Sequence, residues 1–504
     1  MKKIIFTVTM ILFTVCILAM TIRGIEGNPT PEEILIDLRS EGKPFELSPE
    51  RGRYALLTSI VDDKSLSFKQ EIAEYVVPDL GYINGKYVSL FAPGVSFIAI
   101  PFYILGKTVN LGQVFTFGVS GLFALLNVFL ISVIVNKFTK NLFAGIVAGL
   151  TFLFATVAWP YAVTFYQHHI TTFLLLLSTY VLTFKTNFTT AFLVSSLFGI
   201  SIFIGYPNAV FFVPFLIFLV IKHVDVKEIN NSLSITIKLS IILGIVALAT
   251  SLIPTYLYNY HAHDDPLQLA GTVQTVKEIK TDSGTGQVIM PSKSVNKKSA
   301  TKFFDPSKLP NGMSVLLTSR DRGLIWFSPI ILLGIFGIYP LYKKNKDIAY
   351  TLIAGVIAIL FLYGMWGDPW GGWAFGPRYL IPAMGLMSIF LGVALATYGK
   401  KFWFTILYFP LLAYSLFVSL IGTLTTNQIP PSVEVDSVNY PQFTFLHNLD
   451  LIHQGKSGSF IYNTFLSNSV SLTRFALILF ISVLLIISLN YVFLFLKIKK
   501  GNTQ

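Results

Sequence analysis

Residues 111–135 read LGQVFTFGVSGLFALLNVFLISVIV and contain no Asp, Glu, Lys or Arg. A helix of about 20 apolar residues spans the roughly 30 Å hydrocarbon core of a bilayer, so this run is long enough to cross a membrane. A helix also satisfies its backbone hydrogen bonds within one segment, as hydrocarbon requires. We therefore expect residues 111–135 to form a transmembrane helix.

Similar apolar runs recur along the chain. Hydrophobic residues make up 53% of the 504 positions and charged residues 12%, with a mean hydropathy of +0.67. A soluble domain carries about 25% charged residues, so an ordinary soluble protein is excluded. The sequence predicts an all-α polytopic integral membrane protein with about 12 transmembrane helices. The predicted spans are 3–21, 111–135, 142–163, 170–184, 188–205, 209–221, 236–258, 324–341, 349–365, 379–398, 402–422 and 475–496.

The net charge of +12 indicates orientation. Lysines cluster beside the apolar runs, and positive residues retain a loop in the cytoplasm. All these lysine clusters lie on the cytoplasmic side of the membrane only if residues 88–105 do not cross it. This run is broken by Pro93, Gly94 and Pro101, and we expect it to lie at the outer interface. The first run resembles a signal peptide without a clear cleavage site, and we interpret it as an uncleaved span. Both termini are then cytoplasmic in a cell membrane, and the long loops 23–87, 259–322 and 423–474 lie outside.

Asp, Glu, Lys and Arg are absent from the apolar cores of spans two to twelve, and ionisable groups gather at the outer ends of spans. Ion-coupled transporters place ionisable groups or broken helices near the bilayer midplane. The pattern therefore favours an enzyme working at the membrane surface over a carrier, although a flippase for lipid-linked oligosaccharides stays as an alternative. The single Cys16 excludes an internal disulfide and a cysteine-based metal site.

The first outer loop contains a predicted helix that begins at Ser48-Pro49-Glu50. Ser48 is suited to the N-cap and Pro49 to the first helical position. Glu50 is then either a first-turn carboxylate favoured by the helix dipole or a functional acid. Local sequence alone does not separate these two interpretations.

Three short motifs in this loop resemble the GT-C glycosyltransferases that use polyprenyl-phosphate sugars, including protein O-mannosyltransferases and the aminoarabinose transferase of lipid A. The motifs are Glu50-Arg-Gly-Arg53-Tyr54-Ala55, Asn84-Gly85-Lys86-Tyr87 and Phe91-Ala92-Pro93-Gly94. They are similar to the family's Asp-Glu-x-Arg-Tyr-Ala and Gly-x-x-Tyr-x-x-Lys-Pro-Pro stretches. The resemblance covers the N-terminal third by motif and the remainder by topology. It implies a GT-C-like catalytic module over residues 1–422, with juxtamembrane helices in loop 23–110 and a second outer loop 259–322, followed by an outer loop and last helix over 423–504.

Two departures from the family pattern bear on the site. Glu50 and Arg51 stand where the family has paired acids, so the resemblance implies either Glu50 or Asp79 as the catalytic base. Phe91 stands where the family has a lysine, so another cation must hold the donor phosphate. The resemblance also places Arg53, Lys86 and Tyr87 among the substrate-binding residues.

The leading candidate for the phosphate ligand is Arg378, because its planar fork can bind two phosphate oxygens. It follows a segment rich in tryptophan and glycine, which is typical either of an interfacial belt or of a surface on which sugars pack. Arg320 and Arg322 are candidates for a second phosphate clamp or for lipid headgroup contacts. Further candidate substrate-binding residues are Asp368, Trp370, His168 and His169.

The resemblance implies an inverting sugar transfer from a polyprenyl phosphate to an acceptor hydroxyl on a glycan, lipid or protein, with no nucleic acid involved. The resemblance implies no particular cofactor, and a divalent metal stays open because His261, His263, Asp264 and Asp265 form a dense cluster. A polymerase or ligase that uses undecaprenyl-linked glycans is a further alternative. Its main loop would fall at 423–474, where the sequence has no evident catalytic constellation.

Overall fold

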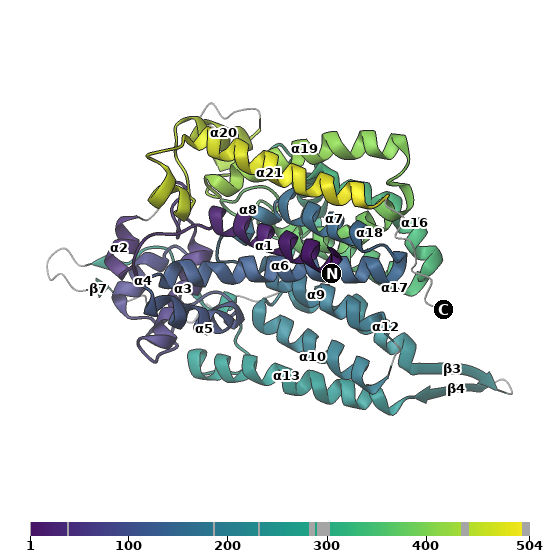
Figure 1. Ribbon diagram of the computed structural model, residues 1–504. Coiled ribbons are helices and arrows are strands. Elements are labelled where there is room, and N and C mark those ends of the chain that lie inside the picture. Colours follow the sequence, from purple (N-terminus) through teal and green to yellow (C-terminus); the bar gives the residue numbers. More distant parts are fainter. Residues whose placement is uncertain are drawn as a thin grey trace.

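The computed structural model describes residues 2–37, 40–184, 187–229, 232–281, 288–289, 303–434 and 443–495. Helices dominate these segments and pack into a membrane-type bundle (Figure 1). Six described helices are long and apolar enough to cross a membrane. They are α6 (Gly112–Thr139), α13 (Leu239–His263), α17 (Lys346–Gly364), α18 (Ile381–Tyr398), α19 (Phe402–Leu424) and α21 (Leu472–Phe493). The predicted helical, polytopic fold is therefore confirmed.

Further helices, most of them shorter or interrupted, occupy the other predicted spans. They are α1 (Lys2–Thr21), α7 (Leu142–Phe154), α8 (Ala158–Ala162), α9 (His168–Leu182), α10 (Phe188–Ile204), α11 (Asn208–Phe211), α12 (Val213–His223), α15 (Leu324–Phe327) and α16 (Ile335–Lys344). Predicted span 324–341 contains a 3₁₀ segment that begins at Pro329. Proline lacks the amide hydrogen that would continue the preceding helix, which explains the interruption there.

The first outer loop is helical, as predicted, and its helices gather at one end of the bundle. α2 (Pro31–Ile36), α3 (Ser48–Val61), α4 (Gln70–Val76) and α5 (Gly94–Thr108) lie together there, and α5 packs against α3 and α6 (Figure 1). Strands β3 (Val224–Ile229) and β4 (Ser232–Ile237) form a hairpin on the other side, and α21 ends toward that side (Figure 1).

A small sheet at the first-loop end was not predicted. Strands β1 (Leu80–Ile83) and β2 (Lys86–Ser89) form an antiparallel hairpin, and β5 (Gln274–Val276) pairs with the other edge of β1. The turn residues Asn84 and Gly85 have φ angles of 50° and 83°. Asn-Gly is the preferred pair for a two-residue hairpin turn because both positions need positive φ. The sheet joins the first outer loop to the second.

Two further helices come from the second and third predicted outer loops, residues 259–322 and 423–474. α14 (Leu309–Thr318) packs on α17, and α20 (Phe445–His453) packs on α19 and α21. Between α19 and α20, residues Thr425 to Ile429 have no regular secondary structure but are buried. A buried loop must find partners for its backbone groups inside the protein. Those partners lie in the candidate site.

Candidate active site

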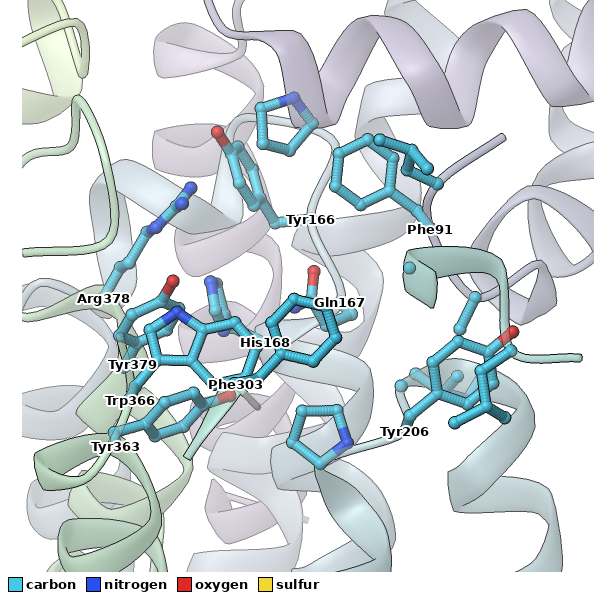
Figure 2. A pocket seen from close by; sticks show the side chains of 18 of the residues that line it. Phe91, Tyr166, Gln167, His168, Tyr206, Phe303, Tyr363, Trp366, Arg378 and Tyr379 are labelled. Carbon is cyan, nitrogen blue, oxygen red and sulfur yellow. The ribbon is translucent and has the colours of Figure 1, made fainter. Parts of the chain in front are cut away.

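A cavity of about 390 Å³ lies where the first outer loop meets the loops that precede and follow the apolar helices. Figure 2 shows Arg378 on one side, Phe91 on the other, and Tyr166, Gln167 and His168 between them. Its remaining lining is largely aromatic and aliphatic. The lining residues are Pro49, Arg53, Leu90, Phe91, Ala92, Tyr166, Gln167, His168, Ile204, Gly205, Tyr206, Pro207, Val210, Leu269, Gly271, Thr272, Phe303, Phe304, Tyr363, Trp366, Arg378 and Tyr379.

Two arginines flank Tyr166 in this cavity. The guanidinium carbon of Arg53 lies 5.5 Å from the centre of the Tyr166 ring, and that of Arg378 lies 5.2 Å from it. The Arg53 guanidinium also lies 4.7 Å from the Phe91 ring centre. Such cation–π contacts hold a guanidinium in place without neutralising its charge. The sequence analysis predicted Arg53 and Arg378 as substrate-binding residues, and the structure brings them together.

Neutral groups supply the hydrogen-bond partners of these guanidiniums. Arg53 donates from Nη1 to the Pro49 carbonyl oxygen at 2.8 Å and from Nη2 to Gln167 Oε1. Arg378 donates from Nη2 to the Gly371 carbonyl oxygen at 2.6 Å. Within the described residues, neither arginine forms an ion pair, and the Nε of each has no partner. Burial lowers the pKa of Arg53 to about 10, and the charge of Arg378 contributes to that shift.

The loop that carries Arg378 needs glycine at three positions. Gly371, Gly372 and Gly376 have φ angles of 75°, 61° and 60°, in the region where residues with a Cβ are strained. At Gly371 a Cβ would also come within 3.1 Å of Arg378 Nε. The Asp368 carboxylate accepts from the Gly372 amide and stabilises the turn. Asp368 therefore supports the backbone behind Arg378 and does not line the cavity.

Arg322 is buried on the other side of the same loop. It donates to the carbonyl oxygens of Trp370, Gly372 and Ile429 at 3.0, 3.2 and 2.8 Å. Burial lowers its pKa to about 10. The guanidinium thus fixes the loop through backbone carbonyls, and neither Arg322 nor Trp370 lines the cavity. Arg320, two residues earlier, is exposed and also lies outside the lining.

Glu50 is buried in the first turn of α3, one residue after Pro49 of the cavity wall. Its side chain is 1% exposed, and neither carboxyl oxygen has a side-chain hydrogen-bond partner in the part of the chain that the structure describes. The pKa of Glu50 is raised to about 8, chiefly by burial and also by the Glu46 carboxylate, while Arg23 and Arg51 oppose the shift. A carboxyl with a pKa near the working pH is suited to take up a proton. Glu50 is not itself part of the cavity lining.

Glu46 lies four residues before Glu50, just ahead of α3, and was not predicted. It forms a buried ion pair with Arg23 and accepts from the amides of Gly42 and Asn427 at 2.8 and 2.6 Å and from Thr426 Oγ1. Arg23 also donates to the Gly422 carbonyl oxygen at 3.1 Å. This network ties the end of α1, the first outer loop and residues Thr426–Asn427 together. The predicted boundary between residues 1–422 and 423–504 falls inside it.

The alternative base, Asp79, is half-buried and accepts from Ser48 Oγ at 2.6 Å. It lies near enough to Arg53 to raise the pKa of that guanidinium, although the two form no ion pair. Lys86 lies farther away, 3.5 Å from Asp264 in an exposed pair. Tyr87 packs against Tyr82 within the sheet. Lys86 and Tyr87 are therefore not cavity residues in this structure.

The two adjacent histidines occupy different environments. His168 lines the cavity and stacks on Tyr166, with ring centres 5.6 Å apart and an interplanar angle of 10°. His169 faces the interior of the helix bundle, where its Nε2 lies 2.8 Å from the Ala158 carbonyl oxygen. Asn127 Nδ2 donates to the His169 carbonyl oxygen at 3.0 Å. His168 alone is placed to contact a ligand.

Within the part of the chain that the structure describes, no three His, Cys, Asp or Glu side chains gather closely enough to hold a metal ion. In the predicted cluster, His263 Nδ1 lies 3.1 Å from the Gln268 carbonyl oxygen, and Asp264 accepts from Asn84 Nδ2 at 3.0 Å. These side chains are engaged with neighbouring protein groups. We derive no reaction step that uses a metal.

Several cavity residues were missed by sequence reasoning. Tyr166 and Gln167 immediately precede the predicted His168, so the outer end of α9 was recognised but its aromatic neighbour was not. Tyr206 lies in the turn before α11, Tyr363 in the last turn of α17, and Tyr379 in a 3₁₀ turn over Arg378–Leu380. Tyrosines are common in apolar sequence contexts, and only the fold brings these rings around one cavity.

No protein-family model matches the sequence, and no curated protein matches it. Among solved structures, ArnT from Cupriavidus metallidurans in the apo state aligns with a TM-score of 0.52 and 12% identity, over 97% of this chain and 77% of that chain. ArnT from the same organism bound to undecaprenyl phosphate aligns with a TM-score of 0.50, 12% identity and the same coverage. At this identity the comparison establishes a shared fold. This chain therefore has an ArnT-like polytopic membrane fold.

Proposed function

We propose that this chain is an integral membrane glycosyltransferase that moves a sugar from a polyprenyl-phosphate donor to an acceptor hydroxyl at the outer face of the cell membrane. The observation that carries the proposal is a largely apolar cavity with two buried, unpaired arginines, adjacent to the buried acid Glu50. The shared fold with ArnT, which has been solved bound to undecaprenyl phosphate, supports it.

The cavity matches both halves of a lipid phosphate. Aromatic and aliphatic walls such as Phe91, Tyr206 and Trp366 suit isoprenoid carbons, because burying apolar surface is favourable. Arg53 and Arg378 suit the phosphate, since guanidinium–phosphate hydrogen bonds are among the stronger ones in proteins. Two guanidiniums also suit the charge that develops during transfer. The donor phosphodiester carries one negative charge, and the departing phosphate monoester carries up to two, so the site favours the departing group.

The reaction is a single displacement with inversion at the anomeric carbon. The acceptor oxygen forms a bond to that carbon while the bond from carbon to phosphate oxygen breaks, and its electron pair stays on the phosphate. Glu50 takes the acceptor proton, a role worth typically 10²- to 10⁴-fold in rate. Asp79 is the second candidate for this role. The direct test incubates the purified chain with labelled polyprenyl-phosphate sugars and cell-envelope acceptors, and absence of any transferred label contradicts the proposal.

Replacing either cavity arginine weakens binding of the lipid phosphate. We expect Arg53→Ala or Arg378→Ala to raise the Kd for undecaprenyl phosphate by roughly 10- to 100-fold, the loss of about 1.5–3 kcal/mol that accompanies removal of a charged hydrogen-bond donor. Arg378→Lys should restore little, because an ammonium cannot reproduce the planar fork. The measurement is competition against a labelled undecaprenyl phosphate in nanodiscs.

Arg474→Ala is the matched control for both arginine variants, because Arg474 is exposed at the start of α21 and lies outside the cavity lining. It should bind undecaprenyl phosphate as tightly as the wild type. If Arg53→Ala and Arg378→Ala also bind with wild-type affinity, the lipid phosphate does not occupy this cavity.

A further inference from the structure

We propose that the donor for this site carries an uncharged, hydroxyl-bearing sugar and not an amino sugar, because the cavity combines two unpaired guanidiniums with uncharged polar atoms. The inference rests on the proposed function and adds a substrate class to it. It follows from the charge on the cavity wall and from the polar atoms left without partners there.

The cavity wall carries positive charge alone. Its described lining residues include Arg53 and Arg378 but no Asp or Glu. Neither arginine is neutralised by an ion pair among the described side chains. The nearby acids lie outside the lining: Glu50 is the proposed base, and Asp79 accepts from Ser48 Oγ at 2.6 Å. Any carboxylate available to an amino sugar would have to come from these two groups, which have other roles.

The sugar cannot lie far from the guanidiniums. In a polyprenyl-phosphate sugar, the anomeric carbon is bonded directly to a phosphate oxygen, so the ring begins one bond from the group that Arg53 and Arg378 bind. An ammonium on that ring would lie a few ångströms from two like charges. Repulsion at this range is strong at a buried site because the effective dielectric constant is well below that of water. One phosphodiester charge offsets only one of the two arginines.

Uncharged polar atoms lie between Arg378 on one side of the cavity and Phe91 on the other. Tyr166 and His168 are buried, and among the described residues the Tyr166 hydroxyl and His168 Nε2 have no hydrogen-bond partner. Gln167 lies between them in sequence and lines the same wall (Figure 2). Buried polar atoms without partners cost free energy, and a sugar hydroxyl can both donate to and accept from them. The wall is therefore complementary to a neutral polyol.

The test compares two donors that differ by one group. Undecaprenyl-phosphate glucose and undecaprenyl-phosphate 6-amino-6-deoxyglucose have nearly the same shape, but the second carries an ammonium at neutral pH. Each competes with labelled undecaprenyl phosphate for the purified full chain in nanodiscs, so no acceptor needs to be known. We expect the glucosyl donor to bind more tightly by on the order of 10²-fold, as two like charges at this range predict. Equal affinity, or tighter binding of the amino sugar, overturns the inference.

A charge-changing variant tests the cause. Gln167→Glu places a carboxylate beside Arg53, which the glutamine already contacts, and should narrow the affinity ratio between the two donors by roughly tenfold. The same change at exposed Gln70 on α4 should leave the ratio unaltered. A ratio that does not respond to Gln167→Glu overturns the electrostatic argument. If undecaprenyl phosphate itself fails to bind the wild type, the proposed function fails, and this inference fails with it.

Discussion

We expect Glu50→Gln to slow the proposed sugar transfer strongly and at the same time to stabilise the folded protein. The amide cannot take up the acceptor proton, so the transfer rate falls by about 10²- to 10⁴-fold. The stability gain arises because Glu50 is buried without a side-chain partner. An amide of the same shape has no charged form to desolvate. If removing the charge of a buried acid stabilises the folded protein, then burial of that acid costs stability. Such costly, perturbed groups are typical of functional sites.

The sign of the stability effect follows from the pKa. The pKa of Glu50 is raised from 4.5 to about 8 in the folded protein, so between these values the folded state binds more protons than the unfolded state. The free energy of unfolding of the wild type therefore falls as the pH rises from about 4.5 to about 8. Relative to wild type, Glu50→Gln gains stability across that range and keeps a constant advantage above it, at most about 5 kcal/mol.

The measurements are transfer rate and Tm at several pH values between 5 and 9, with Glu32→Gln on the exposed face of α2 as control. The wild-type rate should rise with pH through about 8, because Glu50 must lose its proton before it can accept one. The control should show neither the rate loss nor the pH-dependent gain in Tm. Wild-type transfer by Glu50→Gln would remove Glu50 as the base. A large loss in Asp79→Asn would then assign the role to Asp79.

The helical fold could be predicted because its cause is local. Apolar runs such as 111–135 are long, free of charge and bounded by lysines, so each can be recognised without its neighbours. The three-stranded sheet was missed because β5 lies almost 200 residues from β1 in the chain. Its hairpin did carry a local signal, since Asn84-Gly85 between apolar residues is typical of a two-residue turn. That pair was interpreted only as part of a motif.

The site was predictable where a charged residue stood out against an apolar background. Glu50, Arg53, His168 and Arg378 are conspicuous in this way, and three of them line the cavity. Arg322 was equally conspicuous, but its guanidinium holds backbone carbonyls of another loop. A sequence reveals that a buried charge needs partners but not whether those partners are protein or ligand. The distinction requires the tertiary contacts.

Glu46→Ala should destabilise the protein more than any other single change at this end of the bundle. Arg23 and Glu46 are almost fully buried, with side chains 1% and 0% exposed. Removing one partner of a buried ion pair leaves the other charge without compensation, typically at a cost of about 3–5 kcal/mol. The alanine also leaves the Gly42 and Asn427 amides without an acceptor. We expect a markedly lower Tm, or failure to fold.

Glu46→Gln and Thr426→Val disturb this network less than the alanine does, and the pH profile of transfer separates folding from catalysis. The glutamine keeps one oxygen acceptor but carries no charge, and the Glu46 charge is one cause of the raised pKa of Glu50. Its loss should therefore move the rise in transfer rate to lower pH, whereas a defect in folding alone would lower the rate equally at all pH values. Thr426→Val removes one hydrogen-bond donor to Glu46. Thr423→Val is the matched control, because the Thr423 hydroxyl donates to a carbonyl oxygen within its own helix. A pH profile unchanged in Glu46→Gln would mean that the network supports the fold without adjusting the base.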